Sequence, residues 1–171
     1  QVNGNTTVIA INNSGQFIVN AGFSSGDEFT FSTRLYNNST SFTEIPLIAG
    51  ELSNNGVLSL AINNQGHVTG SATVTDVGQS VFFYDGTNTI SLGSGSGVGI
   101  NDMDQIVGVN ADGVFIFDGS TLNNLSNLID PSSGWVLQQA KDINNLGQII
   151  GTGFLNGEFH GYLLTPTAVP V

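Results

Sequence analysis

The chain has 171 residues, of which 39% are hydrophobic and only 9% are charged, and it carries thirteen acidic residues against two basic ones. The net charge of −11 disfavours nucleic acid and anionic membranes as partners, because neutralising phosphate requires many Lys and Arg side chains. The absence of cysteine excludes disulfides, thiolate catalysis and cysteine-rich zinc sites, and no apolar run reaches the ~18 residues of a membrane-spanning helix. Composition therefore indicates a globular protein whose polar surface consists mostly of Asn, Ser, Thr and Gly.

One short phrase recurs along the chain. It reads Ile-Asn-Asn-Ser-Gly-Gln from residue 11, Ile-Asn-Asn-Gln-Gly-His from 62, Ile-Asn-Asp-Met-Asp-Gln from 100 and Ile-Asn-Asn-Leu-Gly-Gln from 143. A spacing of about 40 residues is the signature of structural repeats. We therefore divide one domain, residues 1–171, into repeats at approximately 8–50, 57–93, 96–128 and 135–166.

The first two repeats predict short strands joined by tight turns. In the first, a hairpin over residues 35–47 follows a longer insertion at 24–34. In the second, strands are expected at 57–62, 67–71, 80–84 and 89–92. Asp85-Gly86 between the last two strands predicts a hairpin with a two-residue type I′ turn.

The last two repeats follow the same order. The third has a strand at 114–117, the turn Asp118-Gly119 and a strand around 122–125, and one helical turn is expected within 125–130. The segment 135–140 is ambiguous. In the fourth repeat, a strand at 159–164 is followed by Thr165-Pro166 and by no convincing fourth strand, so the last repeat is expected to be one strand short.

These elements predict an all-β fold made of four repeats of a four-stranded antiparallel unit. Four strands in about 40 residues is the size of a β-propeller blade, which indicates a small β-propeller or propeller-like architecture. A linear stack of the same units is the alternative, because in both cases each unit buries its faces against its neighbours. Glycines inside the second strands, Gly70, Gly108 and Gly151, indicate strands that crowd together near a common axis.

The repeated phrase has a structural interpretation. Asparagine side chains mimic a backbone turn, and glycine accepts a positive φ. We therefore assign the turn between the first two strands of each unit to the repeat-motif residues Asn12, Asn63, Asn101, Asn144, Gly15, Gly66 and Gly147.

The phrase Ile-Asn-Asn-x-Gly-Gln-(Ile/Val)-x-Gly also resembles the signature of the HAF-type extracellular repeat family of bacteria. The His-Ala-Phe triplet of that family is matched by His160-Gly161-Tyr162, with Gly for Ala and Tyr for Phe. The order of residues 128–137, 143–145 and 163–166 is similar to the usual end of these proteins. The tail at 167–171 is similar to the lead-in to a Pro-Glu-Pro sorting signal, although no such motif follows it. The resemblance implies secretion and a surface or matrix location, and it brings no catalytic residues.

No group of side chains forms a catalytic or metal-binding constellation. His67 stands where the other repeats have Gln, and His160 belongs to the triplet, so both are interpreted as structural. Asp102 and Asp104 have the D-x-D spacing of calcium ligands but lack the glycine and the later acidic ligand of a specific calcium loop. We therefore expect no catalytic residue, no cofactor and no metal site, and the protein is not expected to be an enzyme.

Two functions remain. The first is a secreted structural or adhesive surface or matrix protein that assembles with copies of itself. The second is a glycan-binding module, in which Trp135, Tyr36 and Tyr84 would stack on sugar rings. The sequence begins with Gln1 rather than Met, which with the uncharged surface favours removal of a signal peptide; an arbitrary boundary is the alternative.

The missing strand of the last unit suggests how copies would assemble. An exposed strand edge is a template for pairing, and the proline-containing tail is poorly suited to it. The amino-terminal Gln1, Val2, Asn3, Gly4, Asn5, Thr6 and Thr7 contain no proline and are expected to supply the strand. Within one molecule this pairing would close a four-bladed ring, and between molecules it would build a filament.

Overall fold

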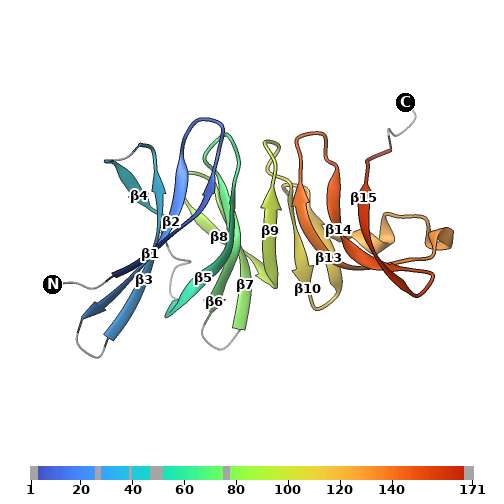
Figure 1. Cartoon of the computed structure of the whole chain (residues 1–171), viewed down its shortest axis with the longest axis horizontal. Helices are drawn as coiled ribbons and strands as arrows, with labels where there is room; N and C mark the ends of the chain where they lie inside the picture. Colours follow the sequence, from blue (N-terminus) through green and yellow to red (C-terminus); the bar gives the residue numbers. More distant parts are fainter. Residues whose placement is uncertain (1–3, 26–27, 39, 47–51, 75–77, 168–171) are drawn as a thin grey trace.

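The computed structural model describes residues 4–25, 28–38, 40–46, 52–74 and 78–167, and within them the fold is all-β. Figure 1 shows four antiparallel sheets that follow one another along the longest axis, with β1 at one end and β15 at the other. The predicted four-unit fold is confirmed. The sheets are stacked and are not closed into a ring, so the architecture is propeller-like.

Each sheet is one repeat. Unit 1 contains β1 (Gly4–Ile11), β2 (Phe17–Ser25), β3 (Glu28–Tyr36) and β4 (Phe42–Glu44). Unit 2 contains β5 (Leu52–Ile62), β6 (Val68–Val74), β7 (Gly78–Tyr84) and β8 (Thr89–Ser94). Unit 3 contains β9 (Ser96–Ile100), β10 (Ile106–Asn110), β11 (Gly113–Phe117) and β12 (Leu122–Asn124). Unit 4 contains β13 (Trp135–Ile143), β14 (Ile149–Leu155) and β15 (Glu158–Leu164), and strands pair in chain order in all four sheets.

The connection between units 3 and 4 holds two short 3₁₀ turns, η1 (Leu125–Asn127) and η2 (Pro131–Ser133). The first lies within the predicted helical turn, and the ambiguous segment 135–140 lies in β13. Asp130 caps η2 by accepting a hydrogen bond from the Ser132 backbone N–H at 2.8 Å. None of the helical segments in the described residues has the length and apolar character needed to cross a membrane.

The amino-terminal prediction is not met within this molecule. Residues 4–7 extend β1 and pair with β2, in a register that places Gly4 opposite Phe23 and Thr7 opposite Asn20. A neighbouring strand in the same hairpin is reached at a smaller loop-closure cost than β15, at the far end of the stack. Gln1, Val2 and Asn3 lie outside the described residues. The sheet of unit 4 has three strands among the described residues, so the predicted short last unit is confirmed there.

Two local predictions also differ from the structure. The insertion at 24–34 is largely strand, because β2 runs to Ser25 and β3 starts at Glu28. At Asp85-Gly86 the hairpin is correct but the turn is longer than two residues. Tyr84 pairs with Thr89, and the Asp85 carboxylate accepts the backbone N–H groups of Thr87 and Asn88. The carboxylate therefore organises the loop, with positive φ only at Gly86.

The hydrophobic core is divided among the three junctions between units. Ile18 and Leu35 of unit 1 pack against Val68 and Phe82 of unit 2. The second junction joins Val81 of unit 2 to a set from unit 3, namely Ile100, Ile106, Phe115 and Phe117. The third joins Val107, Val114 and Leu125 of unit 3 to Leu137, Ala140, Ile143, Ile149 and Tyr162 of unit 4. Each junction thus buries one face of each of two adjacent sheets, and among the described residues only the sheets of units 2 and 3 bury both faces in this way.

The strand glycines of units 3 and 4 are crowded as predicted, but by residues of their own sheets and not by strands gathered at a common axis. A Cβ on Gly108 would overlap the Ser96 carbonyl oxygen and the Phe115 ring. A Cβ on Gly151 would overlap the Gln139 carbonyl oxygen and the Tyr162 ring. Glycine is therefore required at both positions by the close approach of the first strand and of an aromatic ring.

Candidate functional site

The repeated asparagines build each turn from within. The Asn12 side-chain oxygen accepts the backbone N–H groups of Ser14 and Gln16 at 3.0 and 2.9 Å. Equivalent pairs of bonds, at 3.0 to 3.1 Å, are made by Asn63, Asn101 and Asn144. Gly15, Gly66 and Gly147 adopt φ values of +78°, +83° and +72° in these turns. These residues therefore form the turn between the first two strands of their units.

The same asparagines also join one unit to the next. The Asn12 side-chain amide donates to the Asn63 carbonyl oxygen at 2.9 Å, Asn63 donates to the Asn101 carbonyl at 3.0 Å, and Asn101 donates to the Asn144 carbonyl at 3.1 Å. We call this series the asparagine ladder. Sequence reasoning assigned these residues to turns and missed the bonds between units, although an asparagine repeated once per unit is the signal expected of such a ladder.

A second row of bonds runs beside the first, and we include it in the asparagine ladder. The backbone N–H of Asn13 donates to the Asn64 side-chain oxygen at 2.9 Å. The N–H of Asn64 donates to the Asp102 carboxylate at 2.8 Å, and the N–H of Asp102 donates to the Asn145 side-chain oxygen at 2.9 Å. The side-chain amides of Asn64 and Asn145 also donate to Asp102. These bonds, led by those from Asn64, hold the pKa of Asp102 below its usual range.

The third turn departs from the repeated sequence at one position, and the side chain there bonds to the preceding unit. Asp104 replaces the turn glycine and adopts a φ of +59°. Its carboxylate accepts the Asn63 amide at 2.8 Å and lies 2.8 Å from Nδ1 of His67. The other units have an intra-unit glutamine at the position of His67, and Asn12, Asn101 and Asn144 each donate to it. Asp102, Asp104 and His67 are therefore parts of the ladder.

The ladder has an open end at each terminus of the stack. In unit 4 the Asn144 side-chain amide donates only to Gln148 of its own turn among the described residues. In unit 1 the Asn12 carbonyl accepts Gly15 of its own turn and receives no bond from another described unit. Asn145 N–H and the exposed Asn13 side chain are likewise without a ladder partner in the described residues. The donor end thus lies on unit 4 and the acceptor end on unit 1.

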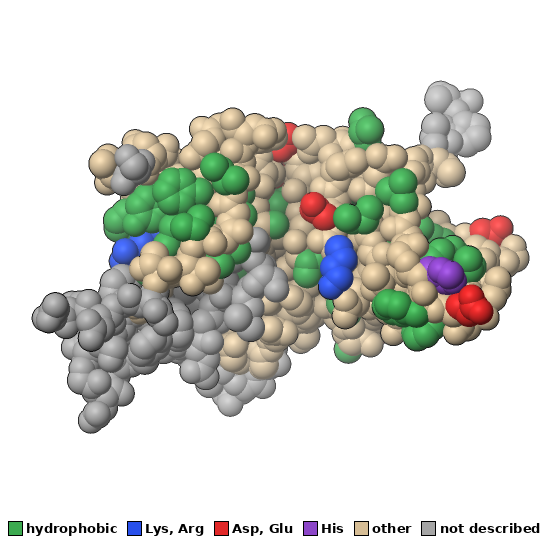
Figure 2. Space-filling view, viewed as in Figure 1, with side chains coloured by type: hydrophobic (Ala, Val, Ile, Leu, Met, Phe, Trp, Pro, Cys, Tyr) green, Lys and Arg blue, Asp and Glu red, His purple; other side chains and the backbone are tan. Residues whose placement is uncertain are grey.

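The outer sheet faces at the two ends carry exposed apolar side chains. We define the leading face, on unit 1, by Val8, Ile11 and Phe42, which are 64%, 69% and 43% exposed. Phe42 continues a row of rings, because Tyr36 stacks on Phe17 at 4.9 Å and lies 5.1 Å from Phe42. Figure 2 shows apolar side chains gathered over this end of the molecule.

The opposite end presents the trailing face. It is formed by Val136, Ile150, Phe154, Phe159 and Leu163, which are between 38% and 63% exposed. Strand pairing places Phe154 opposite both Val136 and Phe159, and Ile150 opposite Leu163, so all five side chains share one side of the sheet. Five large apolar residues exposed on one sheet face indicate an interaction surface.

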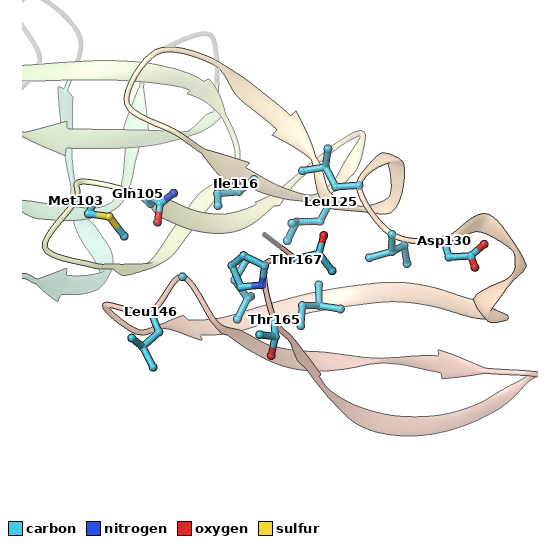
Figure 3. A pocket seen from close by; sticks show the side chains of 14 residues that line it. Met103, Gln105, Ile116, Leu125, Asp130, Leu146, Thr165 and Thr167 are labelled. Carbon is cyan, nitrogen blue, oxygen red and sulfur yellow. The ribbon is translucent and has the colours of Figure 1, made fainter. Parts of the chain in front are cut away.

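A cleft of ≈660 Å³ lies between units 3 and 4 (Figure 3). One wall carries Ile116 and Leu125, and the residues that follow β15, including Thr165 and Thr167, form the other. Leu128, Ile129 and Leu164 complete a lining that is mostly apolar. The cleft contains no cluster of ionisable groups that would suggest acid–base chemistry.

The predicted sugar-stacking aromatics are not gathered at one site. Tyr84 is buried at the first junction, and Tyr36 packs between Phe17 and Phe42. Trp135 packs edge-on against His160 and Tyr162, with ring centroids 6.4 and 5.9 Å apart. A separate polar hollow of ≈420 Å³ is lined by Asn110, Asp112, Phe115, Leu122, Asn123, Asn124 and Asn127.

Among residues 4–25, 28–38, 40–46, 52–74 and 78–167, no group of three or more His, Asp or Glu side chains is arranged to hold a metal ion. The two histidines are in different units, His67 in the ladder and His160 on β15 near Glu158. Neither lies in a cluster that would support catalysis, and the expectation that the protein is not an enzyme stays a prediction.

The carboxylates of the hairpin loops make stability depend on pH. Asp118 accepts the Thr121 and Ser120 backbone N–H groups at 2.8 and 2.9 Å, and the Ser120 hydroxyl at 2.8 Å. These bonds, with that from Thr121 strongest, hold the pKa of Asp118 far below its usual range. A lowered pKa stabilises the fold above the unfolded-state pKa of about 4, and this contribution is lost as the pH falls further.

We expect the melting temperature to fall on acidification below about pH 4. The Asp118→Asn variant, which keeps the acceptor oxygen, should show a weaker fall, and identical curves would contradict this origin.

Comparison with known proteins gives one distant likeness. No protein-family model and no curated protein sequence matches the chain. A fucose lectin from Kordia zhangzhouensis, solved in complex with methyl-fucoside, superposes on 70% of this chain and 96% of its own, with 16% sequence identity and a TM-score of 0.39. So low a TM-score does not establish a common fold, and the lectin's ligand does not inform the site described above. The resemblance to the HAF-type repeats stays a prediction.

Proposed function

We propose that the protein is a secreted structural subunit of a cell surface or extracellular matrix, and that its copies assemble into filaments. The observation that carries the proposal is the pair of apolar faces at the two ends of the stack. Repeat proteins that remain soluble as monomers normally cover each end with a capping unit whose outer face is polar. Here Ile11 and Val8 at one end, and Phe159 and Leu163 at the other, are more than half exposed.

Two features of the chain agree with this role. The contacts that stabilise the subunit are distributed over three similar junctions, as in structural repeat proteins. A surface with few charges also opposes self-association weakly at moderate ionic strength, where charges more than ~10 Å apart are screened. The secreted location rests on composition and on the resemblance of the turn phrase.

Electron microscopy and sedimentation velocity of the purified chain test the proposal. We expect polymers above a threshold concentration. Because each subunit carries a net charge of −11, adding salt should lower that threshold by screening repulsion between subunits. A chain that stays monomeric at all concentrations and salt levels would contradict the proposal.

Glycan binding is the second candidate, favoured by the polar hollow of unit 3. Asparagine and aspartate side chains offer the donors and acceptors that sugar hydroxyls require, and four Asn and one Asp line this hollow. A glycan array probed with the purified chain, and with an Asn127→Ala variant, separates the two functions. Binding that the variant loses would favour the lectin-like role, whereas an array without signal would remove it.

A further inference from the structure

We infer that copies of this chain join end to end, the trailing face of one against the leading face of the next, so that the repeat stack continues across the joint. The inference rests on the proposed function and specifies its contact. The apolar faces and the open ladder ends support it separately.

The trailing face corresponds to a surface that is buried inside the chain. Aligning the turns of units 3 and 4 places Ile150 and Leu163 at the positions of Val107 and Ile116. Val107 is fully buried against unit 4, and Ile116 packs in the same junction. Ile150 and Leu163 are 49% and 60% exposed because no described unit follows unit 4. The trailing face therefore repeats the half of a junction that unit 3 presents to unit 4.

The leading face corresponds to the other half of that junction. The same alignment places Val8 and Ile11 of unit 1 at the positions of Ala140 and Ile143 of unit 4. Ala140 and Ile143 are 2% and 4% exposed, since they are packed against unit 3. Their counterparts on unit 1 are more than half exposed. The two end faces are thus the two sides of one interface, so we expect a second copy of this chain as the occupant of each.

The ladder ends match in the same direction. Each unit donates its asparagine amide to the carbonyl of the next, and the series stops at Asn144 with an unused inter-unit donor and begins at Asn12 with an unused acceptor. Placing unit 1 of a second copy after unit 4 brings Asn144 to the Asn12 carbonyl. It also brings the Asn145 N–H to the Asn13 side chain, as Asp102 meets Asn145 within the chain. This polarity favours a head-to-tail joint, because two like ends would present only donors or only acceptors to each other. A head-to-tail joint builds an open filament unless its rotation closes a ring, and the four units of one copy already follow one another along its longest axis without closing, which favours the filament.

Two variants, one for each face, test the joint. Ile11→Asp places a charge on the leading face and Ile150→Asp places one on the trailing face. Both side chains are exposed in the subunit, so both variants should melt like the parent. Each variant alone should be monomeric at concentrations where the parent polymerises. An equimolar mixture should give a 1:1 dimer, because one intact leading face then meets one intact trailing face.

Other outcomes separate the inference from the proposed function. A parent that never polymerises overturns both. A parent that polymerises, with variants that polymerise equally well, overturns only the end-to-end joint and points to strand addition at the edge of β15. A variant that dimerises alone shows that like faces pair, and a mixture that stays monomeric shows that the faces are not complementary. Either result overturns the inference.

The ladder is tested by Asn13→Ala, which removes an acceptor used only across the joint. We expect the polymerisation threshold to rise about fivefold, the effect of one lost hydrogen bond, with the melting temperature of the subunit unchanged. The matched variant is Asn64→Ala. The Asn64 side-chain oxygen accepts the Asn13 N–H within the chain, so this variant should lower the subunit's melting temperature. An unchanged threshold in Asn13→Ala would remove the ladder from the joint.

Discussion

Replacing Gly151 with alanine is expected to destabilise the subunit by at least about 3 kcal/mol, the upper part of the range for overpacking a dense core. The added Cβ would overlap the Gln139 carbonyl oxygen of β13 and the Tyr162 ring of β15. Neither can yield easily, because Tyr162 is buried and its hydroxyl donates to that same Gln139 carbonyl at 2.8 Å. Thermal or denaturant unfolding measures the loss.

Gly161→Ala is the matched control for this variant. Gly161 lies on β15, opposite Thr152 and one residue from Tyr162, but a Cβ there would meet its nearest neighbour at 3.7 Å. We expect a change in the free energy of unfolding within about 0.5 kcal/mol, as for an ordinary surface substitution. If both variants were equally stable, the close approach of β13 to Gly151 would not be a constraint on the fold.

Replacing Asn63 with alanine is expected to destabilise the subunit by roughly 3 kcal/mol, since it removes several bonds of about 1 kcal/mol each from a buried site. Asn63 is 3% exposed. Its oxygen accepts two turn N–H groups, and its amide donates to the Asn101 carbonyl and the Asp104 carboxylate. In a chain of this length the melting temperature should fall by about 10 °C.

Asn144→Ala provides the comparison. The sequence assigned the same turn role to both asparagines, but Asn144 is exposed and makes no bond to another described unit. The loss of stability measured on monomeric subunits should therefore be clearly smaller for Asn144→Ala than for Asn63→Ala. Equal losses would mean that the turn bonds alone account for the effect and that the ladder contributes nothing.

The repeats and most strands could be predicted from the sequence because turns are encoded locally. Each Ile-Asn phrase combines a side chain that accepts two N–H groups with a residue that tolerates positive φ, and both are visible without a structure. Even Asp104 was recognisable as a turn variant by its alignment with Gly15 and Gly66. Its carboxylate accepts a hydrogen bond from the Asn63 side-chain amide of the preceding unit. That bond could not be predicted from the sequence, because it depends on how the two units pack.

The arrangement of the units could not be predicted in the same way. No pattern within a strand encodes the angle between successive sheets, so the residues indicated a small propeller or propeller-like fold and left a linear stack as the alternative. The prediction for the amino-terminal segment was not met within this molecule for a related reason. A short run without proline fits many sheet edges, and residues 4–7 pair with the nearest one, β2. The end faces were missed because Val8, Ile11 and Ile150 look like the core residues of any other unit. Only their exposure in the folded chain distinguishes them.

Site-specific cross-linking tests the end-to-end joint most directly, because the chain contains no cysteine of its own. Ser14 and Leu146 occupy equivalent places in the turns of units 1 and 4, both are exposed, and neither supplies a ladder bond to another unit. Ser14→Cys and Leu146→Cys proteins, mixed under polymerising conditions and treated with a short bis-maleimide, should give cross-linked dimers that contain one copy of each. A protein with both substitutions should give a regular series of covalent oligomers. Cross-links only between like cysteines, or polymers that contain none, would contradict the head-to-tail stack.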